Sequence, residues 1–284
     1  MNFKTTAWDY DNHLAFAKAS NAAYDADFGV AGLKALGFDT VVPLPVVNDI
    51  LGIVASNSEA VVCVFRGTIS EKQGKLDPNN WVTDAEAAQV PFEDCFGVPQ
   101  IGSVHEGFAK ALLPIWASLT AEVERQRTGA QGLWMAGHSL GGSLAHLAAA
   151  AFTFALREPV NGVYTYGQPR IGDITFCTLS DNHLGDVHFR SVNSQDIVTR
   201  VPPRIFPHFP GLEYYGHSGK LIYFDDSGVP HTDEVYWNTF LASVDVGFHD
   251  MGDLLDGQVI TDHFIGHYIA RIEAAQTALL GLKW

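Results

Sequence analysis

A serine stands among glycines in the stretch GHSLGG. In the pattern G-x-S-x-G the serine occupies a sharp turn from a strand into a helix, which lifts its hydroxyl above the edge of a sheet. The residues two before and two after it must be very small, and Gly137 and Gly141 meet that requirement, while Gly142 lets the helix approach the strand. Glycine costs about 1 kcal/mol relative to alanine inside a helix, so stability does not explain these glycines. The stretch predicts a nucleophile elbow around Ser139 that includes His138. A glycine-softened turn with a capping serine is the alternative.

A serine hydroxyl is a weak nucleophile near neutral pH, so it needs a histidine to take its proton and a carboxylate to orient that histidine. Where this elbow occurs in α/β-hydrolases, the chain order is serine, then the acid, then the histidine. Asp196 follows the strand-like run VHFRSV, which would bring its carboxylate to the same sheet edge as the serine. A solvated aspartate that supports the turn before Pro202 is the alternative. Asp173, Asp181 and Asp186 read as surface charges.

The chain has 12 histidines, and several of them follow Asp196. His263, in TDHFIGHY, begins the last predicted helix, and His267 lies one turn further on. Such a pair could bind a metal, but HFIGH lacks the glutamate of H-E-x-x-H, so no metal site is expected. His217, His231 and His249 also follow Asp196. Chain order alone leaves these candidates for the base open.

The segments around these residues alternate between strand-like and helix-like sequence. ILGIVAS and AVVCVFRG predict a β-hairpin, and LWMAG, GVYTYG and VHFRSV predict further buried strands. Helices are predicted over residues 11–24 and 104–127, after LWMAG, and over the final HFIGHYIARIEAAQTALL. This alternation predicts an α/β fold with a mostly parallel central sheet flanked by helices. No repeat or linker divides the chain, so residues 1–284 are expected to form a single domain.

Composition excludes several classes of partner. The formal net charge is −15 and no run of Lys or Arg could follow a phosphate backbone, so no nucleic acid partner is expected. Apolar runs fall short of the 18 or more residues typical of a spanning helix, so no transmembrane segment is expected. The N-terminal MNFKTTAWDYDNHLAF shows no signal peptide, which leaves a cytoplasmic location or secretion with an absent signal. Three isolated cysteines, Cys63, Cys95 and Cys177, argue against a disulfide framework.

Several segments between about Val61 and Ile269 together resemble the fungal-type class 3 lipases, a branch of the α/β-hydrolases. In order they are VVCVFRGT, NNWVTD, SVHEGFAKAL, MAGHSLGGSLAHLAA, VYTYGQPRIGD, NSQDIVTRVPP, YYGHSGKLIY and DHFIGHYI. The resemblance implies an α/β-hydrolase fold with a helical lid. It implies that Ser139 is the nucleophile, Asp196 the orienting acid and His263 the general base. It further implies an oxyanion hole formed by Thr68 and the backbone N–H of Leu140.

The segment after the implied oxyanion residue departs from the family pattern. ISEKQGKLDPN precedes Asn80-Trp81, where the fungal enzymes continue almost at once into the helical lid. We therefore expect a remodelled lid over about residues 69–99, with Trp81, Val82 and Ala85 on one apolar face. A surface helix packed on the core is the alternative. The disulfides of the family have no evident counterpart here, which puts secretion in doubt.

The aromatic segment PPRIFPHFPGLEYYG follows the implied acid. Phe206, Phe209 and Leu212, with Ile205 and Tyr214, are candidates to line an acyl pocket. Simple loop packing explains these residues about as well.

The resemblance implies a serine carboxylester hydrolase, a triacylglycerol lipase that releases fatty acids through an acyl-enzyme intermediate. It implies contact with a lipid–water interface and requires no cofactor. A feruloyl esterase or a phospholipase A1 with the same triad is the first alternative. A non-catalytic lipase-like binding protein is the second, although no residue of the triad is eroded.

Overall fold

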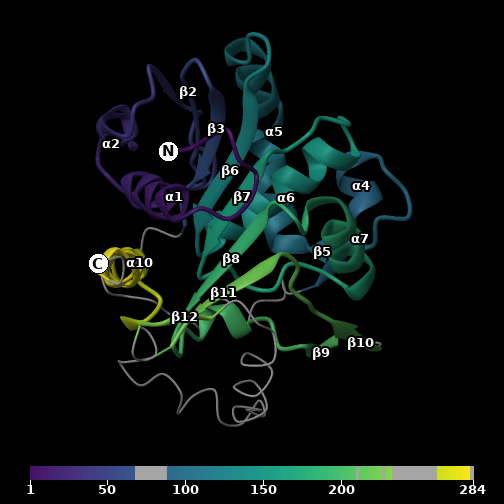
Figure 1. Cartoon of the computed structure of the whole chain (residues 1–284). Coiled ribbons are helices and arrows are strands. Elements are labelled where there is room, and N and C mark those ends of the chain that lie inside the picture. Colours follow the sequence, from purple (N-terminus) through teal and green to yellow (C-terminus); the bar gives the residue numbers. More distant parts are fainter. Residues whose placement is uncertain (68–87, 209–210, 226–227, 232–260, 282–284) are drawn as a thin grey trace.

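The computed structural model describes residues 1–67, 88–208, 211–225, 228–231 and 261–281. At its centre is an eight-stranded sheet in the order β1-β2-β3-β6-β7-β8-β11-β12 (Figure 1). The strands of this sheet are β1 (Thr40–Pro43), β2 (Gly52–Ser56), β3 (Ala60–Phe65), β6 (Gly132–His138), β7 (Gly162–Tyr166), β8 (His188–Asn193), β11 (Lys220–Phe224) and β12 (Pro230–His231).

Most neighbouring strands of the central sheet run parallel. The pairs β3·β6, β6·β7, β7·β8 and β8·β11 are parallel, whereas β1, β2 and β3 pair antiparallel and β12 pairs antiparallel with β11. The antiparallel β2–β3 pair is the hairpin predicted from ILGIVAS and AVVCVFRG. The carboxyl ends of β3, β6, β7 and β8 therefore meet at one edge of the sheet, where the chain leaves each strand and where open α/β sheets bind ligands.

Helices cover both faces of the sheet (Figure 1). The helices are α1 (Tyr10–Ala22), α2 (Val30–Ala35), α4 (Phe92–Phe96), α5 (Glu106–Gln126), α6 (Leu140–Phe154), α7 (Ile174–Leu184), the 3-10 turn η3 (Val198–Arg200) and α10 (Ile265–Gly281). One core cluster packs α5, α6 and α7 on one face, and a second packs α1, α2 and α10 on the other. The predicted α/β architecture, a mostly parallel sheet between helices, is confirmed.

Local sequence explains the central elements. Every residue of AVVCVF in β3 is buried, because a strand covered on both faces needs a continuous apolar run. In α5 the buried side chains include those at the predicted helical spacing, from Phe108 to Val123. In α6 every residue from Gly141 to Phe152 is buried, because its small alanines pack between the sheet and neighbouring helices.

Among the described residues, two small sheets lie outside the central one. β4 (Gln89–Pro91) pairs with β5 (Ser103–His105), and β9 (Ile205–His208) pairs with β10 (Gly211–Tyr214). The predicted lid covers about residues 69–99, and its residues 69–87 lie outside the described residues. The end of that segment forms β4 and α4, and Phe92 of α4 is buried in the core.

The first and last described helices pack against each other (Figure 1). Lys18 of α1 forms an ion pair of 2.8 Å with Glu273 of α10, and the side chain of Gln276 donates to Asp11. Both helices lie against the same face of the sheet. No helix in the described ranges is long and apolar enough to cross a membrane. All three cysteines are free thiols.

Candidate active site

Ser139 stands on the turn between β6 and α6. Its backbone has φ 59° and ψ −128°, a conformation that residues other than glycine rarely adopt. Its N–H donates to the carbonyl of Tyr166 at 2.8 Å, and its own carbonyl accepts from the N–H of Gly142 at 2.9 Å. The hydroxyl makes no capping hydrogen bond to α6. A helix-capping role therefore does not explain this serine.

The glycines of the elbow are required by close main-chain contacts. A Cβ at Gly137 would lie 2.1 Å from the carbonyl oxygen of Gly141. A Cβ at Gly141 would lie 2.1 Å from the carbonyl oxygen of Phe65, at the end of β3. At Gly142 the contact is milder, 3.2 Å from the side chain of Gln168. The first two positions have no room for any side chain.

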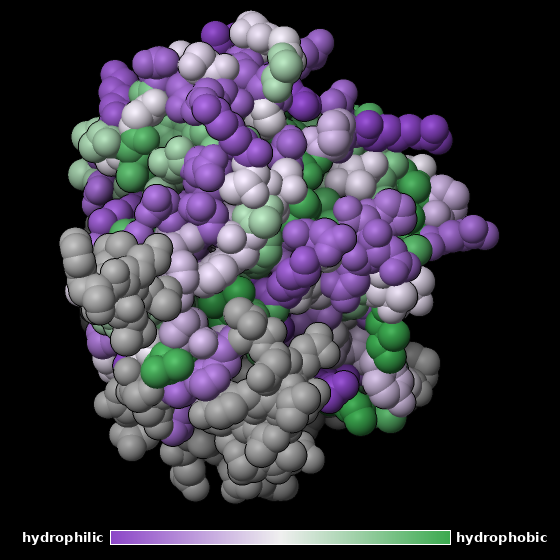
Figure 2. Space-filling model, viewed as in Figure 1, coloured by the Kyte–Doolittle hydropathy of each residue, from purple (hydrophilic) through white to green (hydrophobic). Residues whose placement is uncertain are grey.

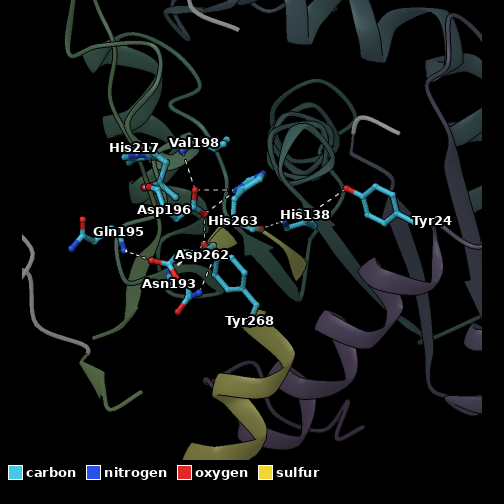
Figure 3. A network of polar contacts seen from close by, with 11 residues as sticks. Tyr24, His138, Asn193, Gln195, Asp196, Val198, His217, Asp262, His263 and Tyr268 are labelled. Carbon is cyan, nitrogen blue, oxygen red and sulfur yellow. Dashed lines mark hydrogen bonds and ion pairs between the residues drawn. The ribbon is translucent and has the colours of Figure 1, made fainter. Parts of the chain in front are cut away.

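Asp196 lies in the loop after β8 and is completely buried. Its carboxylate accepts hydrogen bonds from the N–H of Val198 at 2.9 Å, from the hydroxyl of Tyr268 at 2.6 Å and from His263 (Figure 3). Burial alone would raise the pKa of this carboxyl, but the charge and hydrogen bond of His263, with the bonds from Tyr268 and Val198, outweigh burial and lower the pKa. The aspartate is therefore held as the anion.

His263 faces Asp196 through Nδ1, at 2.9 and 3.0 Å from the two carboxylate oxygens. Both side chains are fully buried. Because a carboxylate only accepts hydrogen bonds, Nδ1 carries the hydrogen, and Nε2 is the basic nitrogen of the neutral ring. The pair is thus arranged for a ring that accepts a proton at Nε2 and is stabilised by the anion behind it.

The end of β7 connects this pair to the serine. Tyr166 accepts the N–H of Ser139, and the next residue is Gly167, with φ 59°. A Cβ at Gly167 would lie 2.8 Å from the ring of His263 and 2.9 Å from a carboxylate oxygen of Asp196. A single dipeptide therefore contacts the backbone of the serine, the histidine and the aspartate. The structure brings Ser139, Asp196 and His263 together at the carboxyl edge of the sheet.

The other histidines that follow Asp196 have different partners. Nε2 of His217 faces the carbonyl of Thr199 at 2.7 Å, and Nε2 of His231 faces the carboxylate of Asp225 at 2.8 Å. His267 is exposed on α10, and His249 lies outside the described residues. In the part of the chain that the structure describes, no group of three or more His, Cys, Asp or Glu side chains could hold a metal ion.

The structure describes only some of the remaining predicted site residues. Leu140 is the first residue of α6, where backbone N–H groups have no acceptor within the helix. Thr68, Trp81, Val82, Ala85 and Phe209 lie outside the described residues. Phe206 is half-buried in β9, while Leu212 of β10 is exposed.

Sequence reasoning missed four residues around the acid and the base, of which Gly167 and Tyr268 contact them directly. Besides Gly167 and Tyr268, these are Asn193, whose side-chain amide donates to the carbonyl of Asp262 at 2.8 Å, and Tyr24, whose hydroxyl lies 3.0 Å from Nδ1 of His138. A signal existed only for Gly167, since a glycine directly after a buried strand is typical of a close backbone approach. The others make contacts across the fold that leave no pattern in the sequence.

The sequence profile described as Lipase (class 3) matches residues 62–206, just over half of the chain. The chain belongs to the class 3 lipase family. A secreted mono- and diacylglycerol lipase of Fusarium solani is 32% identical to this chain over 157 residues, which are 52% of this chain and 44% of that protein. A lipase of Rhizomucor miehei is 30% identical over 165 residues, 56% of this chain and 42% of that protein. The chain therefore spans less than half the length of either relative.

Solved structures share the fold of this chain. The triacylglyceride lipase of Rhizomucor miehei superimposes with a TM-score of 0.58 at 24% sequence identity, over 76% of this chain and 81% of that one. The expected α/β-hydrolase fold is confirmed.

Proposed function

We propose that this class 3 lipase hydrolyses the carboxylic esters of acylglycerols, with Ser139 as nucleophile, His263 as general base and Asp196 as the orienting acid. The single observation that carries the proposal is the buried pair of His263 and Asp196, held against the same dipeptide as the backbone of the elbow serine. The relatives that are lipases of mono-, di- and triacylglycerols support this substrate class. Triacylglycerol is the substrate we expect first.

The chemistry follows from these roles. Ser139 Oγ attacks the ester carbonyl carbon while His263 Nε2 takes the hydroxyl proton, and Asp196 stabilises the resulting imidazolium. The carbonyl oxygen becomes an oxyanion that accepts hydrogen bonds from the N–H of Leu140 and from Thr68. Collapse of the tetrahedral intermediate breaks the bond to the alcohol, which His263 protonates, and leaves an acyl group on Ser139. Water, deprotonated by His263, then releases the fatty acid. No step requires a cofactor.

Contact with a lipid–water interface is also part of the proposal. Ile205 and Tyr214 lie directly opposite each other on the β9–β10 hairpin, and Leu212 shares their face because side chains alternate along a strand. These side chains are 50%, 48% and 57% exposed. Figure 2 shows hydrophobic residues at this edge of the molecule. An exposed apolar face near the segment that carries Asp196 suits a substrate that arrives from a lipid phase.

The deciding experiment compares Ser139→Ala with Ser143→Ala. Both serines are buried at the start of α6, one turn apart. We expect Ser139→Ala to abolish hydrolysis of p-nitrophenyl butyrate and emulsified triolein, and to abolish labelling by a fluorophosphonate probe, while Ser143→Ala retains both. A folded Ser139→Ala protein with near wild-type turnover would overturn the proposal. A wild type that neither hydrolyses esters nor labels would favour the non-catalytic binding protein.

A scan of acyl length from C4 to C18, with methyl ferulate and a phosphatidylcholine alongside, tests the substrate class. We expect activity on acylglycerols. Strong activity on ferulate with none on emulsified long chains would instead identify a feruloyl esterase, and preference for phosphatidylcholine a phospholipase.

A further inference from the structure

The proposed base lies on a segment that no regular hydrogen-bond ladder holds. His263 stands in the turn at residues 262–264, directly before α10. A base must be held within a fraction of an ångström of its productive position, because misplacement by about 1 Å can cost a factor of about 10² in rate. Contacts from outside the turn must therefore supply the rigidity that a helix or strand would give.

Side chains from two strands hold successive carbonyls of this turn. The amide of Asn193, at the end of β8, donates to the carbonyl of Asp262 at 2.8 Å. Nε2 of His138, at the end of β6, lies 2.7 Å from the carbonyl of His263 itself (Figure 3). The N–H of Gln195 also donates to the carboxylate of Asp262 at 3.2 Å. The backbone of the base is thus fixed to the same strand end that carries the elbow serine.

The hydrogen-bond partners of His138 define its tautomer. A carbonyl oxygen only accepts, so Nε2 of His138 carries the hydrogen in this contact. In the neutral ring Nδ1 is then an acceptor, and the hydroxyl of Tyr24 donates to it at 3.0 Å. Tyr24 lies just beyond α1, which packs against α10. The chain of contacts runs from the N-terminal helical segment, through His138, to the backbone of His263.

The ring of His138 also packs against the ring of the base. Their centroids are 4.7 Å apart with an interplanar angle of 33°, and the ring of Tyr268 meets His138 edge-on at 6.1 Å. His138 is 1% exposed, so it does not exchange its partners for water. Nδ1 of His263 therefore faces Asp196, and the ring of His138 packs against the ring of His263. Nε2 of His138 also donates to the backbone carbonyl of His263.

We propose that His138, oriented by Tyr24, is a positioning residue that fixes the general base His263 in place through its backbone carbonyl. This inference rests on the proposed function, because it assigns His138 a role in the placement of the proposed base. His138 does not touch the reacting atoms. Its role requires an N–H donor at the position of Nε2 and a hydroxyl behind it at Nδ1.

Three variants test this role. His138→Leu removes the donor, His138→Gln restores an N–H near the position of Nε2, and Tyr24→Phe removes only the hydroxyl. With p-nitrophenyl butyrate we expect His138→Leu to lower kcat by about 10²-fold, as expected for a displaced base, with KM changed less than about twofold. We expect His138→Gln to recover most of that loss. Tyr24→Phe should lower kcat about fivefold, the effect of one typical hydrogen bond.

His146→Leu is the matched control. His146 is also a fully buried histidine, on α6, and its Nε2 lies 2.7 Å from the hydroxyl of Ser180, away from the turn that bears His263. We expect its kcat per folded molecule to stay near that of the wild type. Thermal unfolding of each variant, followed by circular dichroism, separates loss of fold from loss of position.

A double-mutant cycle completes the test. If Tyr24 acts through His138, adding Tyr24→Phe to His138→Leu should cause no further loss of kcat. The proposal is wrong if folded His138→Leu keeps wild-type kcat, if His138→Gln is as impaired as His138→Leu, or if the two losses are additive. Should His138→Leu fail to fold, the rescue by glutamine and the effect of Tyr24→Phe still decide. Absence of hydrolysis and of Ser139 labelling in the wild type would instead overturn the proposed function, and the role of His138 with it.

Discussion

The two halves of the candidate site are held in different ways. On the serine half, backbone meets backbone: the N–H of Ser139 bonds the carbonyl of Tyr166, and Gly137 and Gly141 lie against main-chain atoms. On the other half, side chains hold side chains and carbonyls, as Tyr268 does with Asp196 and His138 does with His263. The serine half therefore requires positions that have no side chain, whereas the other half requires particular hydrogen-bond donors.

This difference predicts two kinds of sensitivity. Adding one carbon to the serine half creates a clash that only a movement of the backbone can relieve, so the fold should suffer. Removing one donor from the histidine half leaves the packing almost intact, so activity should fall while the fold persists. The following variants are chosen to separate these outcomes.

Among these variants, the largest effect on activity is expected from Asp196→Asn. The amide would present an N–H or a weaker acceptor to Nδ1 of His263, which favours the wrong tautomer and no longer stabilises an imidazolium. We expect kcat/KM to fall about 10⁴-fold, as for the corresponding change in a serine protease triad, with the fold retained. Kinetics on a soluble ester and circular dichroism measure both. A loss of less than tenfold would show that the aspartate does not act through the histidine.

The largest effect on stability is expected from Gly141→Ala. The new Cβ would lie 2.1 Å from the carbonyl oxygen of Phe65, so the start of α6 must move away from the end of β3. We expect a loss of about 3 kcal/mol or more in the free energy of unfolding, measured by urea denaturation.

Gly266→Ala is the control for that measurement. Gly266 is likewise the second residue of its helix, α10, but a Cβ there would meet nothing within 4 Å. Alanine should therefore be neutral or stabilise by up to about 1 kcal/mol. Equal destabilisation by both substitutions would contradict the contrast between the two halves.

A smaller loss is expected from Tyr268→Phe. The hydroxyl donates to Asp196 at 2.6 Å and accepts from the N–H of Asn193 at 3.1 Å. Burial, with the charge and hydrogen bond of Asp196, raises the pKa of Tyr268 well above its usual range, so it remains a donor. Its loss should raise the pKa of Asp196 and lower kcat about fivefold. Tyr164→Phe, which removes a buried hydroxyl from β7, should leave kcat unchanged.

The last prediction concerns the stability of the scaffold alone. Burial lowers the pKa of His146 to about 3. Below its ordinary pKa of about 6.5, the unfolded chain binds a proton at this histidine that the folded chain does not bind. The free energy of unfolding should therefore decrease as the pH falls from about 6.5 towards 3, by about 1.4 kcal/mol per pH unit for this histidine. Urea denaturation at pH 7, 6 and 5 should show a shallower dependence in His146→Gln. An unchanged dependence would mean that His146 is protonated in the folded protein.

The sequence predicted the features that depend on close main-chain contacts and on the spacing of apolar residues. Glycine spacing indicated the elbow because only glycine fits beside Phe65 and Gly137. The buried run of β3 and the spacing in α5 indicated their elements because packing demands apolar residues at those positions. The resemblance then gave the family.

What the sequence left open depends on contacts between distant residues. Chain order left several histidines as candidates, whereas the structure places only His263, among the described ones, against Asp196. The contact of Tyr24 with His138 joins residues 114 positions apart and follows no period. Segment PPRIFPHFPGLEYYG supplied candidates for an acyl pocket, and part of it forms the β9–β10 hairpin, in which Ile205 and Leu212 are exposed.

The close main-chain contacts at Gly137 and Gly141 restrict which substitutions an engineered variant can carry. In a saturation library at either codon, only the clones that keep glycine should be active. These two positions should therefore be left unchanged in such a library. The outward residues of the β9–β10 hairpin can be randomised without that restriction. Selection for a new ester specificity has more freedom on that rim than in the elbow.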